Sequence, residues 1–488
     1  MDDSDIVLNY FFTSPDKPIF SFRNLPPELQ NYIYLGISRF PSVRERFLKI
    51  LKDKGVLEKV ANNIRENKLT NIIPGDVVQF AAERNSDIYF KWGHGSSSEG
   101  ASVFIISENN PIYATGDQQD FYYPMTTMEF STRYGTRFDI DHIYWDPTLM
   151  QSEFADEIKT TITKNLEIYK NGFESVLQVA SKKQNDEKTK LSALDAIRFI
   201  IPISAYTTVI LGGNVRAVFE HFRKLMTIDD NFMKHYVKES LEELSKVVSG
   251  YFEKLEPDKH IIERNKRLRE FANQIFKKEF KRVKEDIQLF YGLPLEELAL
   301  TQIIYPFCNL PFADVYDKIS GFNESEKKQL FKTATLGRGD KKNPIRGFET
   351  RHLVFEIESP WAYWKDFKRN RMNLRFQQDM RGLAGFDTPD LIKESEIIKE
   401  YENAQKKTSE LVERVYQKFG RMSRIVASQG CRKRYLLCMG PRQMTVLGEL
   451  RTSGGGDIGY RRIASKMIEL TKEKNPRLFG HIKNNFKL

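Results

Sequence analysis

Cysteine and histidine are scarce in this chain, which has three and seven of them among 488 residues. Cys431 and Cys438 are spaced as in neither a zinc knuckle nor a redox pair, and the histidines show no metal-ligand spacing. We therefore expect no metal site. A small, odd number of cysteines favours a reducing, cytoplasmic compartment, with the three thiols as core residues.

Long apolar runs are also missing. The most apolar stretch, 193–213, contains Asp195, Arg198 and Pro202, which is typical of a buried helix interrupted by proline rather than of a membrane span. The first five residues are acidic and show no signal-peptide pattern. These absences predict a protein without membrane segments that stays in the cytoplasm.

What the chain does contain is typical of a globular protein with large cores. Hydrophobic residues make up 40% and charged residues 29%, and there are 35 Phe and 21 Tyr. The net charge of +10 suits either a phosphorylated small ligand or a nucleic acid. Only a basic amphipathic helix expected over 265–288, around Lys277, Lys278, Lys281 and Arg282, favours nucleic acid, which is the less favoured partner.

The pattern of apolar residues predicts an α+β fold. Alternation is typical of strands near 101–106 and 348–358, and helical spacing covers most of 24–68, 154–179 and 391–427. We expect two homologous repeats, each a mixed or antiparallel sheet packed with long helices. The predicted organisation is a helical lead-in (1–70), a first repeat (71–260), a basic helical linker (261–290) and a second repeat (291–488).

The evidence for a repeat is a pair of arginines near the end of each half. Arg198 and Arg216 are as far apart as Arg424 and Arg442, at 18 positions in both cases (216 − 198 and 442 − 424). In each half the first arginine follows a helical run and the second opens another helix. The equal spacing in matched context indicates a diverged tandem duplication.

A short polar pattern, E-F-S-T-R-Y at 129–134, is the strongest candidate for a ligand site. In an extended strand Glu129, Ser131 and Arg133 would share one face, because side-chain direction alternates along a strand. A carboxylate, a hydroxyl and a guanidinium on one face could bind an anionic ligand with hydrogen-bonding groups, such as a nucleotide.

These motifs resemble the flavin-dependent thymidylate synthases, in a long form with two diverged tandem repeats. The family motif is R-H-R-x-x-S-x-N-E-x-S-x-R-Y. The first half retains its end as Glu129, Ser131, Arg133 and Tyr134, with an upstream loop around Ser96. The second half retains its beginning as R-N-R at 369–371, with asparagine in place of histidine. It also has three matching downstream arginines: Arg424, Arg442 and Arg451.

The resemblance implies reductive methylation of dUMP to dTMP, with FAD as cofactor, methylene-tetrahydrofolate as carbon donor and NADPH as reductant. It further implies one composite site, to which each repeat contributes its retained half of the motif. In such a site arginines bind the nucleotide phosphate and the FAD pyrophosphate. The catalytic residues would be Ser131 and Arg451, with Arg451 at the pyrimidine to aid its ionisation.

The same resemblance assigns the remaining binding residues. Glu129, Ser131, Arg133, Arg424 and Arg451 would bind dUMP. The cofactor would be held by Ser96, Glu129, Arg369, Asn370, Arg371 and Arg442. A homodimer of the two-repeat chain would reproduce the homotetramer of the family.

Three functions stay open at this point. The first is the active flavin enzyme, on dUMP or on a related nucleotide with different one-carbon chemistry. The second is a pseudoenzyme that retains the fold and nucleotide binding, which the departures at Asn370 and Gln377 favour. The third is a basic nucleic-acid-binding protein.

Overall fold

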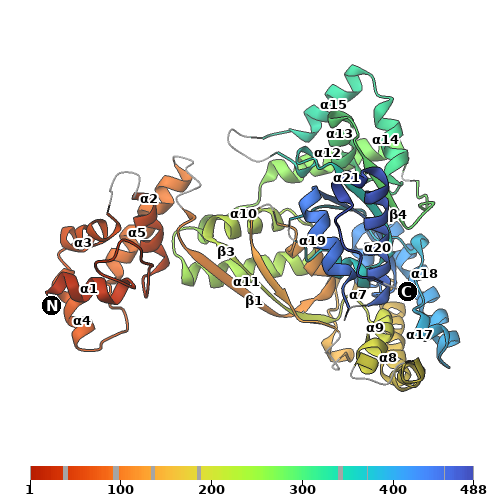
Figure 1. Ribbon diagram of the computed structural model, residues 1–488, viewed down its shortest axis with the longest axis horizontal. Helices are drawn as coiled ribbons and strands as arrows, with labels where there is room; N and C mark the ends of the chain where they lie inside the picture. Colours follow the sequence, from red (N-terminus) through yellow and green to blue (C-terminus); the bar gives the residue numbers. More distant parts are fainter. Residues whose placement is uncertain are drawn as a thin grey trace. The chain divides into compact units, whose positions relative to one another are not determined.

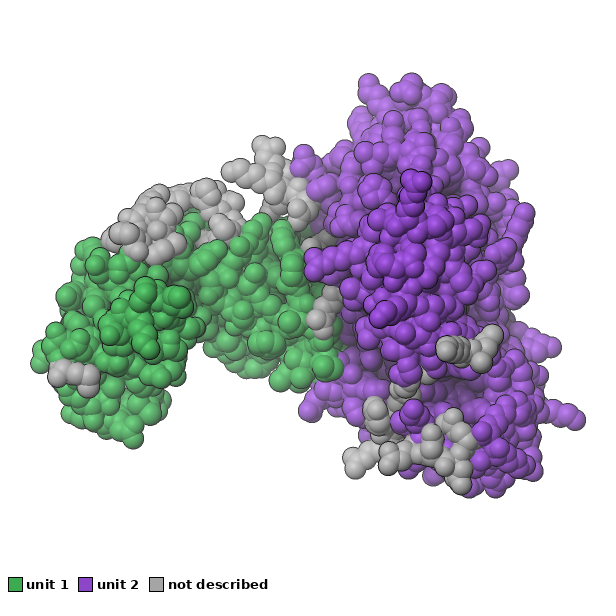
Figure 2. Space-filling view, viewed as in Figure 1, with its two compact units in different colours: residues 1–107, 121–128, 209–258 green, residues 108–120, 129–208, 259–488 purple. Residues whose placement is uncertain are grey.

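The computed structural model describes residues 2–36, 42–91, 98–121, 123–132, 138–183, 188–277, 279–338, 344–370, 372–454 and 457–486. Helices predominate, and two small sheets are present, so the predicted α+β class is confirmed (Figure 1). The chain divides into two compact units, which Figure 2 colours separately. Unit 1 comprises 1–107, 121–128 and 209–258; unit 2 comprises 108–120, 129–208 and 259–488.

The elements follow one another in two stretches of the chain. The first contains α1 (Asp3–Phe11), α2 (Pro27–Gly36), α3 (Val43–Asp53), α4 (Leu57–Arg65), α5 (Gly75–Phe90), β1 (Ser102–Pro111), α6 (Thr115–Gln118), β2 (Thr126–Glu129), α7 (Pro147–Met150), α8 (Ala155–Lys183), α9 (Lys188–Ile197), β3 (Tyr206–Asn214), α10 (Val215–Leu225) and α11 (Asn231–Val247). The second contains α12 (Lys259–Phe276), β4 (Ile287–Tyr291), α13 (Leu295–Ile304), α14 (Phe312–Ser320), α15 (Glu324–Ala334), β5 (Leu353–Pro360), α16 (Trp361–Phe367), β6 (Leu374–Gln377), α17 (Asp390–Lys393), α18 (Ile398–Phe419), β7 (Arg432–Met439), α19 (Pro441–Thr452), α20 (Ile458–Lys474) and α21 (Pro476–Phe479).

The N-terminal helices have a core of their own. Its buried side chains all come from residues 7–81 and include Phe11, Phe47 and Val77. Helix α2 begins at Pro27, and the Ser42 hydroxyl caps α3 by accepting from the Glu45 amide at 3.2 Å. The helices predicted over 24–68 are therefore present.

The predicted basic helix over 265–288 is wrong in its second half. Helix α12 ends at Phe276, Lys277 adopts a left-handed conformation (φ 50°), and β4 begins at Ile287. Lys281 pairs with Asp314 at 2.8 Å, and the Arg282 guanidinium donates to the Leu383 carbonyl. The expected linker over 261–290 thus contains most of a helix, with Lys266, Arg267 and Arg269 exposed on it, and the start of a strand.

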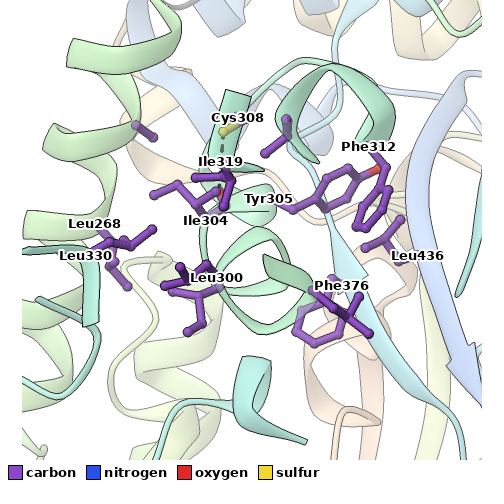
Figure 3. Packing of buried hydrophobic residues seen from close by; sticks show 14 of the residues in the cluster. Leu268, Leu300, Ile304, Tyr305, Cys308, Phe312, Ile319, Leu330, Phe376 and Leu436 are labelled. Carbon is purple, nitrogen blue, oxygen red and sulfur yellow. Dashed lines mark hydrogen bonds between the residues drawn. The ribbon is translucent and has the colours of Figure 1, made fainter. Parts of the chain in front are cut away.

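The larger sheet has the order β4-β5-β7-β6, with all neighbours antiparallel. One face of it packs on α12–α15 through buried side chains that include Phe376 and Leu436 of the sheet and Leu300 and Phe312 of the helices (Figure 3). The Cys308 thiol donates to the Ile304 carbonyl inside this core, and all three cysteines are free and buried. They behave as the core residues that the sequence predicted.

The smaller sheet has the order β1-β3-β2, and three strands of the larger sheet have the same order, β5-β7-β6. Each set begins with a strand, a short helix and a second strand. Each then has a long helix, α8 or α18, which in the first set is followed by the additional helix α9. A 3-10 turn (198–200 or 420–425), the central strand and a further helix, α10 or α19, follow. Arg198 and Arg424 lie in the two 3-10 turns, and Arg216 and Arg442 are the second residues of α10 and α19.

Backbone hydrogen bonds near the central strands match in the same way. The Ile112 amide donates to the Ala205 carbonyl at 2.9 Å, and the Trp361 amide donates to the Cys431 carbonyl at 2.9 Å. The two segments before the central strands also pair with each other, through an antiparallel bridge between Pro202 and Ser428. That bridge joins residues 226 positions apart, as are Arg198 and Arg424 (428 − 202 and 424 − 198).

Candidate functional site

Glu129 is the last residue of β2, and the strand does not continue through the E-F-S-T-R-Y pattern. The expectation that Glu129 and Ser131 share a strand face is therefore wrong, because Ser131 lies beyond the end of the strand. Ser131 is half-buried in irregular backbone, and Thr132 begins a turn. Arg133 and Tyr134 lie outside the described residues. Glu129 itself is buried and accepts a 3.1 Å hydrogen bond from the Gln119 side chain.

Two buried lysines of the α16 region contact this segment. The Lys368 ammonium lies 3.0 Å from the Glu129 carboxylate and also donates to the Thr115 hydroxyl. The Lys365 ammonium donates to the Thr132 hydroxyl at 2.5 Å. Residues three apart on a helix lie on the same side, so both ammonium groups can face one segment. Residues 129–132 and the segment that leads into Arg369 thus meet in unit 2.

The charges of these groups shift one another's pKa values. Burial lowers the pKa of Lys365 to about 7, and the positive charge of Arg198 acts in the same direction. Burial lowers the pKa of Lys368 to about 8, although the Glu129 carboxylate opposes this. Burial would raise the pKa of Glu129, but the positive charges of Lys368, Lys365 and Arg369 hold it below its ordinary value. Glu129 is therefore an ionised carboxylate among cations.

Three arginines surround the carboxylate of Asp366, which follows Lys365 in the sequence. Arg198 and Arg369 each lie 4.0 Å from it, on different oxygens, and Arg451 lies 3.9 Å away. Arg451 also donates to the Asp366 backbone carbonyl at 2.5 Å. We call these four residues the Asp366 cluster. Its distances are ion-pair distances, longer than hydrogen bonds.

Arg198 is fully buried within that cluster and has two more carboxylates near it. Asp195 lies 3.3 Å away and Asp457 3.7 Å away. Burial would lower the pKa of Arg198, but these carboxylates raise it, so the guanidinium stays charged. Burial raises the pKa of Asp457 to about 6, with the charge of Arg198 opposing the shift.

Arg424 is in a different ion-pair group. Its guanidinium lies 2.7 Å from Asp117, whose other oxygen lies 2.5 Å from Arg421. Arg424 also lies over the Tyr113 ring, 4.7 Å from its centroid. Burial would raise the pKa of Asp117, but the two arginines hold it well below its ordinary value. We call Asp117, Arg421 and Arg424 the Asp117 cluster.

The other predicted site residues are less informative. Asn370 is half-buried directly after Arg369, and Arg442 is exposed at the start of α19. Arg442 and Arg451 are nine positions apart on this helix, which places them about 13 Å apart along its axis. Ser96 and Arg371 lie outside the described residues. The structure therefore brings Glu129, Arg369 and Arg451 into one region, and Arg442 outside it.

Sequence reasoning missed the residues that make the contacts here: Thr132, Lys365 and Lys368. Lys365 and Lys368 belong to W-A-Y-W-K-D-F-K, in which lysines three apart follow two tryptophans. Lysines inside an aromatic helical segment are a signal for buried charge, because such a segment packs against the core. Arg198 was recognised as one of the matched arginines, but the sequence pattern gave it no role in the site.

Two absences concern only the described part of the chain. There, no group of three or more His, Cys, Asp or Glu side chains is arranged to hold a metal ion. Likewise, among the helices of that part, none has both the length and the apolar content that crossing a bilayer requires.

Comparison with known proteins gives relatives whose names state no activity. The chain is 24% identical over 505 residues to a UPF0159 protein of Chlamydia pneumoniae, covering 96% of this chain and 92% of that protein. It is 22% identical over 494 residues to a UPF0159 protein of Chlamydia muridarum, covering 96% and 91%. A UPF0159 protein of Thermoplasma acidophilum is 24% identical over 312 residues, covering 62% and 61%. No family model matches the chain.

Proposed function

We propose that this protein is an enzyme of the flavin-dependent thymidylate synthase type. It would methylate dUMP reductively to dTMP, using methylene-tetrahydrofolate, FAD and NADPH, in one composite site. The observation that carries the proposal is the contact between residues 129–132 and the α16 region, through Glu129–Lys368 and Thr132–Lys365. The segment that resembles the end of the family motif there contacts the residues directly before R-N-R, more than two hundred residues further on, and this contact supports the proposal.

We also propose that the chain arose by tandem duplication. The shared strand order, the matched 3-10 turns and the matching backbone bonds of Ile112 and Trp361 support this. The bridge between Pro202 and Ser428 joins two residues at equivalent positions, as a two-fold relation between the repeats would require. A homodimer of such chains would have the four repeats of the family's homotetramer, and we place it in the cytoplasm.

The ion-pair contacts of the arginines change which residues we assign to substrate binding. Arg451 and Arg369 share the Asp366 cluster with Arg198, whereas Arg424 is held by Asp117. We therefore assign to Arg198 the substrate contact that the sequence suggested for Arg424. Glu129 would orient the bound pyrimidine or flavin, and Arg451 would stabilise negative charge on the pyrimidine when its proton is lost.

Part of the FAD-binding set fits its expected role. The Nη2 atom of Arg369 is buried and has no hydrogen-bond partner among the described residues, so it can donate to a phosphate oxygen. Asn370 is half-buried beside it and Arg442 is exposed. Arg369, with Asn370, would hold the pyrophosphate. Bound FAD would supply the redox chemistry of the methylation, and the chain supplies position and charge.

A second candidate function is nucleotide binding without turnover. The observation in its favour is that arginines expected at the ligand already have carboxylate partners in the chain: Arg424 has Asp117, and Arg451 has Asp366. A ligand would have to compete with these carboxylates.

The test is spectroscopy followed by a turnover assay. The purified protein is titrated with FAD and dUMP, and dUMP-dependent NADPH oxidation is then measured with methylene-tetrahydrofolate present. We expect a bound-flavin absorbance band and turnover. A colourless protein that binds dUMP but that FAD cannot reconstitute would support the second candidate and overturn the first.

Alanine variants locate the site. Ser131→Ala and Arg451→Ala should each lower kcat/KM by at least about tenfold, because each removes a contact to the substrate. Lys406→Ala, at an exposed position of α18, is the matched control and should leave kcat/KM unchanged. Full activity in both site variants would show that the composite site is placed wrongly.

A further inference from the structure

The two sheets of matching strand order differ in what covers one of their faces. In the larger sheet, Leu436 of β7 and Phe376 of β6 are register partners, and both pack in the core formed with α12–α15. Ile210 of β3 lies 226 positions before Leu436, the same separation as that of the first residues of β3 and β7 (436 − 210 and 432 − 206). Leu436 is completely buried, whereas Ile210 is 36% exposed. The covered face of the larger sheet thus corresponds to an exposed face of the smaller one.

Large apolar side chains from all three strands lie on this exposed face. Phe104 and Ile106 of β1 are 59% and 60% exposed, and Met128 of β2 is 70% exposed. The Phe104 ring lies over Gly212 of β3, since a Cβ atom at Gly212 would be 2.2 Å from the Cδ1 atom of Phe104. All of these residues belong to unit 1. We call Phe104, Ile106, Met128 and Ile210 the exposed sheet face.

The opposite face of the same sheet is also apolar, but it is buried. Val103 of β1 and Leu211 of β3 lie on it and are almost inaccessible to solvent. Met125 lies on that side too, with its Cγ atom 3.2 Å from the place of a Cβ atom at Gly213, so Met128, three positions later, lies on the exposed side. An antiparallel sheet with one face in water normally carries polar side chains there. A sheet that is apolar on both faces is typical of one that is covered on both.

The exposed sheet face carries no charge that would oppose an identical surface. The positions that continue this face within unit 1 are Ser102, Thr126 and Gly212, all of them uncharged. Two copies of the chain can therefore meet here without placing like charges opposite one another, although each has a net charge of +10.

The area of the exposed sheet face suits the centre of a protein interface. Taking about 150–200 Å² for each large side chain, the four exposed fractions amount to about 400 Å² of apolar surface. Patches of roughly 300–600 Å² are the largest on typical monomeric proteins and are often functional. A stable interface buries about 800 Å² per partner, with an apolar centre and a polar rim. The four side chains supply about half of that area, and Ser102 and Thr126 lie where a rim would begin.

We propose that a second copy of this chain packs on the exposed sheet face, so that the two smaller sheets cover each other as α12–α15 cover the larger sheet. The same patch of both copies forms such an interface, which is therefore two-fold symmetric. Stacked sheets lie about 10 Å apart and their side chains interdigitate. The homodimer proposed above has no assigned surface, and this inference gives it one without depending on flavin or nucleotide.

Sedimentation equilibrium of the full-length protein over a wide range of concentrations tests the interface. The wild-type chain should show a monomer–dimer equilibrium. Ile106→Glu and Met128→Glu should each raise the dimer dissociation constant at least about a hundredfold, because the symmetry places two unpaired carboxylates in one apolar interface. Both side chains are exposed in a single chain, so the variants should fold, and thermal unfolding of the dilute protein checks this.

Leu295→Glu is the matched control, since Leu295 is 68% exposed at the start of α13, outside unit 1. It should leave the dissociation constant unchanged. A wild-type protein that stays monomeric at every concentration would overturn the second copy as the occupant of this face. A dimer that neither Ile106→Glu nor Met128→Glu weakens, or that Leu295→Glu weakens equally, would show that the copies meet elsewhere.

Cross-linking tests whether the two copies meet face to face. The three native cysteines are buried, so a thiol-specific reagent acts on an introduced cysteine in the folded protein. Ile210→Cys, on the central strand, should be joined to its counterpart in the second copy by a reagent that spans about 10 Å, whereas Leu295→Cys should not. A dimeric protein in which Ile210→Cys gives no cross-link would overturn face-to-face packing.

Failure of this interface and failure of the proposed function can be told apart with Ile106→Glu. The composite site lies within one chain, so a monomeric Ile106→Glu variant that still binds FAD and dUMP would support both proposals. A dimer that Ile106→Glu leaves intact, in a protein that turns over dUMP, would reject the interface alone. A dimer that Ile106→Glu dissociates, in a protein that binds neither FAD nor dUMP, would reject the function alone.

Discussion

The burial of the Lys365 and Lys368 side chains has a free-energy cost that other parts of the fold must offset. A charged ammonium in the interior is tolerated only when a carboxylate, hydroxyl or carbonyl compensates for the water it has lost. Lys368 has Glu129 and Thr115, whereas Lys365 has the Thr132 hydroxyl. The two side chains therefore differ in how completely they are paired, and this difference can be measured.

The Glu129–Lys368 pair should show strong coupling. Removing either partner leaves a buried charge without compensation, at a cost of about 3–5 kcal/mol, whereas removing both costs less than the sum. Urea unfolding of Glu129→Gln, Lys368→Met and the double variant gives the coupling energy. The exposed Lys164–Glu400 pair, at 2.7 Å, is the control and should couple by less than about 1 kcal/mol. Additive effects at Glu129 and Lys368 would contradict the ion pair.

Lys365 should make stability depend on pH. Its pKa is about 7 in the folded protein against an ordinary value of 10.5, so between these values the unfolded chain binds more protons and stability rises with pH. From pH 7 to pH 9 the wild-type protein should gain about 2 kcal/mol relative to Lys365→Met. Urea unfolding at both pH values tests this, with Lys399→Met at an exposed position as control. An equal difference at pH 7 and pH 9 would contradict a depressed pKa.

At this scale sequence reasoning placed Glu129, Arg369 and Arg451 in one region, and the structure brings them together. It could not place the lysines, because whether a basic side chain is solvated or buried depends on the segment that packs on it. It also put Ser131 on a strand face with Glu129, whereas the strand ends at Glu129 and Thr132 makes the contact. Period-two alternation identifies a strand but does not show where its pairing stops.

At the scale of elements, the segments before β3 and β7 pair with each other inside unit 2. The Gly430 amide donates to the Phe199 carbonyl at 2.7 Å, within the region of the Pro202–Ser428 bridge. A Cβ atom at Gly430 would lie 2.4 Å from the Gln405 amide nitrogen and 3.0 Å from the Phe199 carbonyl oxygen. A larger residue therefore requires its neighbours to move.

Gly430→Ala should therefore destabilise the protein by about 2 kcal/mol, as expected for overpacking against a backbone atom. Chemical denaturation measures the change. Gly454→Ala is the control, because nothing lies within 4 Å of a Cβ atom there, and it should change stability by less than about 0.5 kcal/mol. Equal effects of the two substitutions would show that the segments are not closely packed at Gly430.

The types of the elements were largely predictable, because helical spacing and strand alternation can be recognised within a single segment of the sequence. The equally spaced arginines lie in elements of the same type: Arg198 and Arg424 are in 3-10 turns, and Arg216 and Arg442 are the second residues of α10 and α19. The error over 265–288 has a local cause. Basic residues continue past Phe276, so composition gives no sign that α12 ends there.

At the scale of the whole molecule, the net charge of +10 says little about the site. Arg424 and Lys368 are neutralised by carboxylates in the interior, and Lys281, which the sequence placed on a basic helical face, pairs with Asp314. Arg198 likewise has the carboxylates of Asp195, Asp457 and Asp366 within 4.0 Å. If the composite site proposed above is present, each chain should bind one ligand.

The most direct measurement is the number of dUMP molecules that each chain binds in the presence of FAD, from a titration that follows the flavin absorbance band. We predict one dUMP per chain, with affinity reduced at least about tenfold in Arg451→Ala and unchanged in Arg421→Gln. Two equivalent sites per chain, or no flavin band and no dUMP binding at any concentration, would contradict a single composite site.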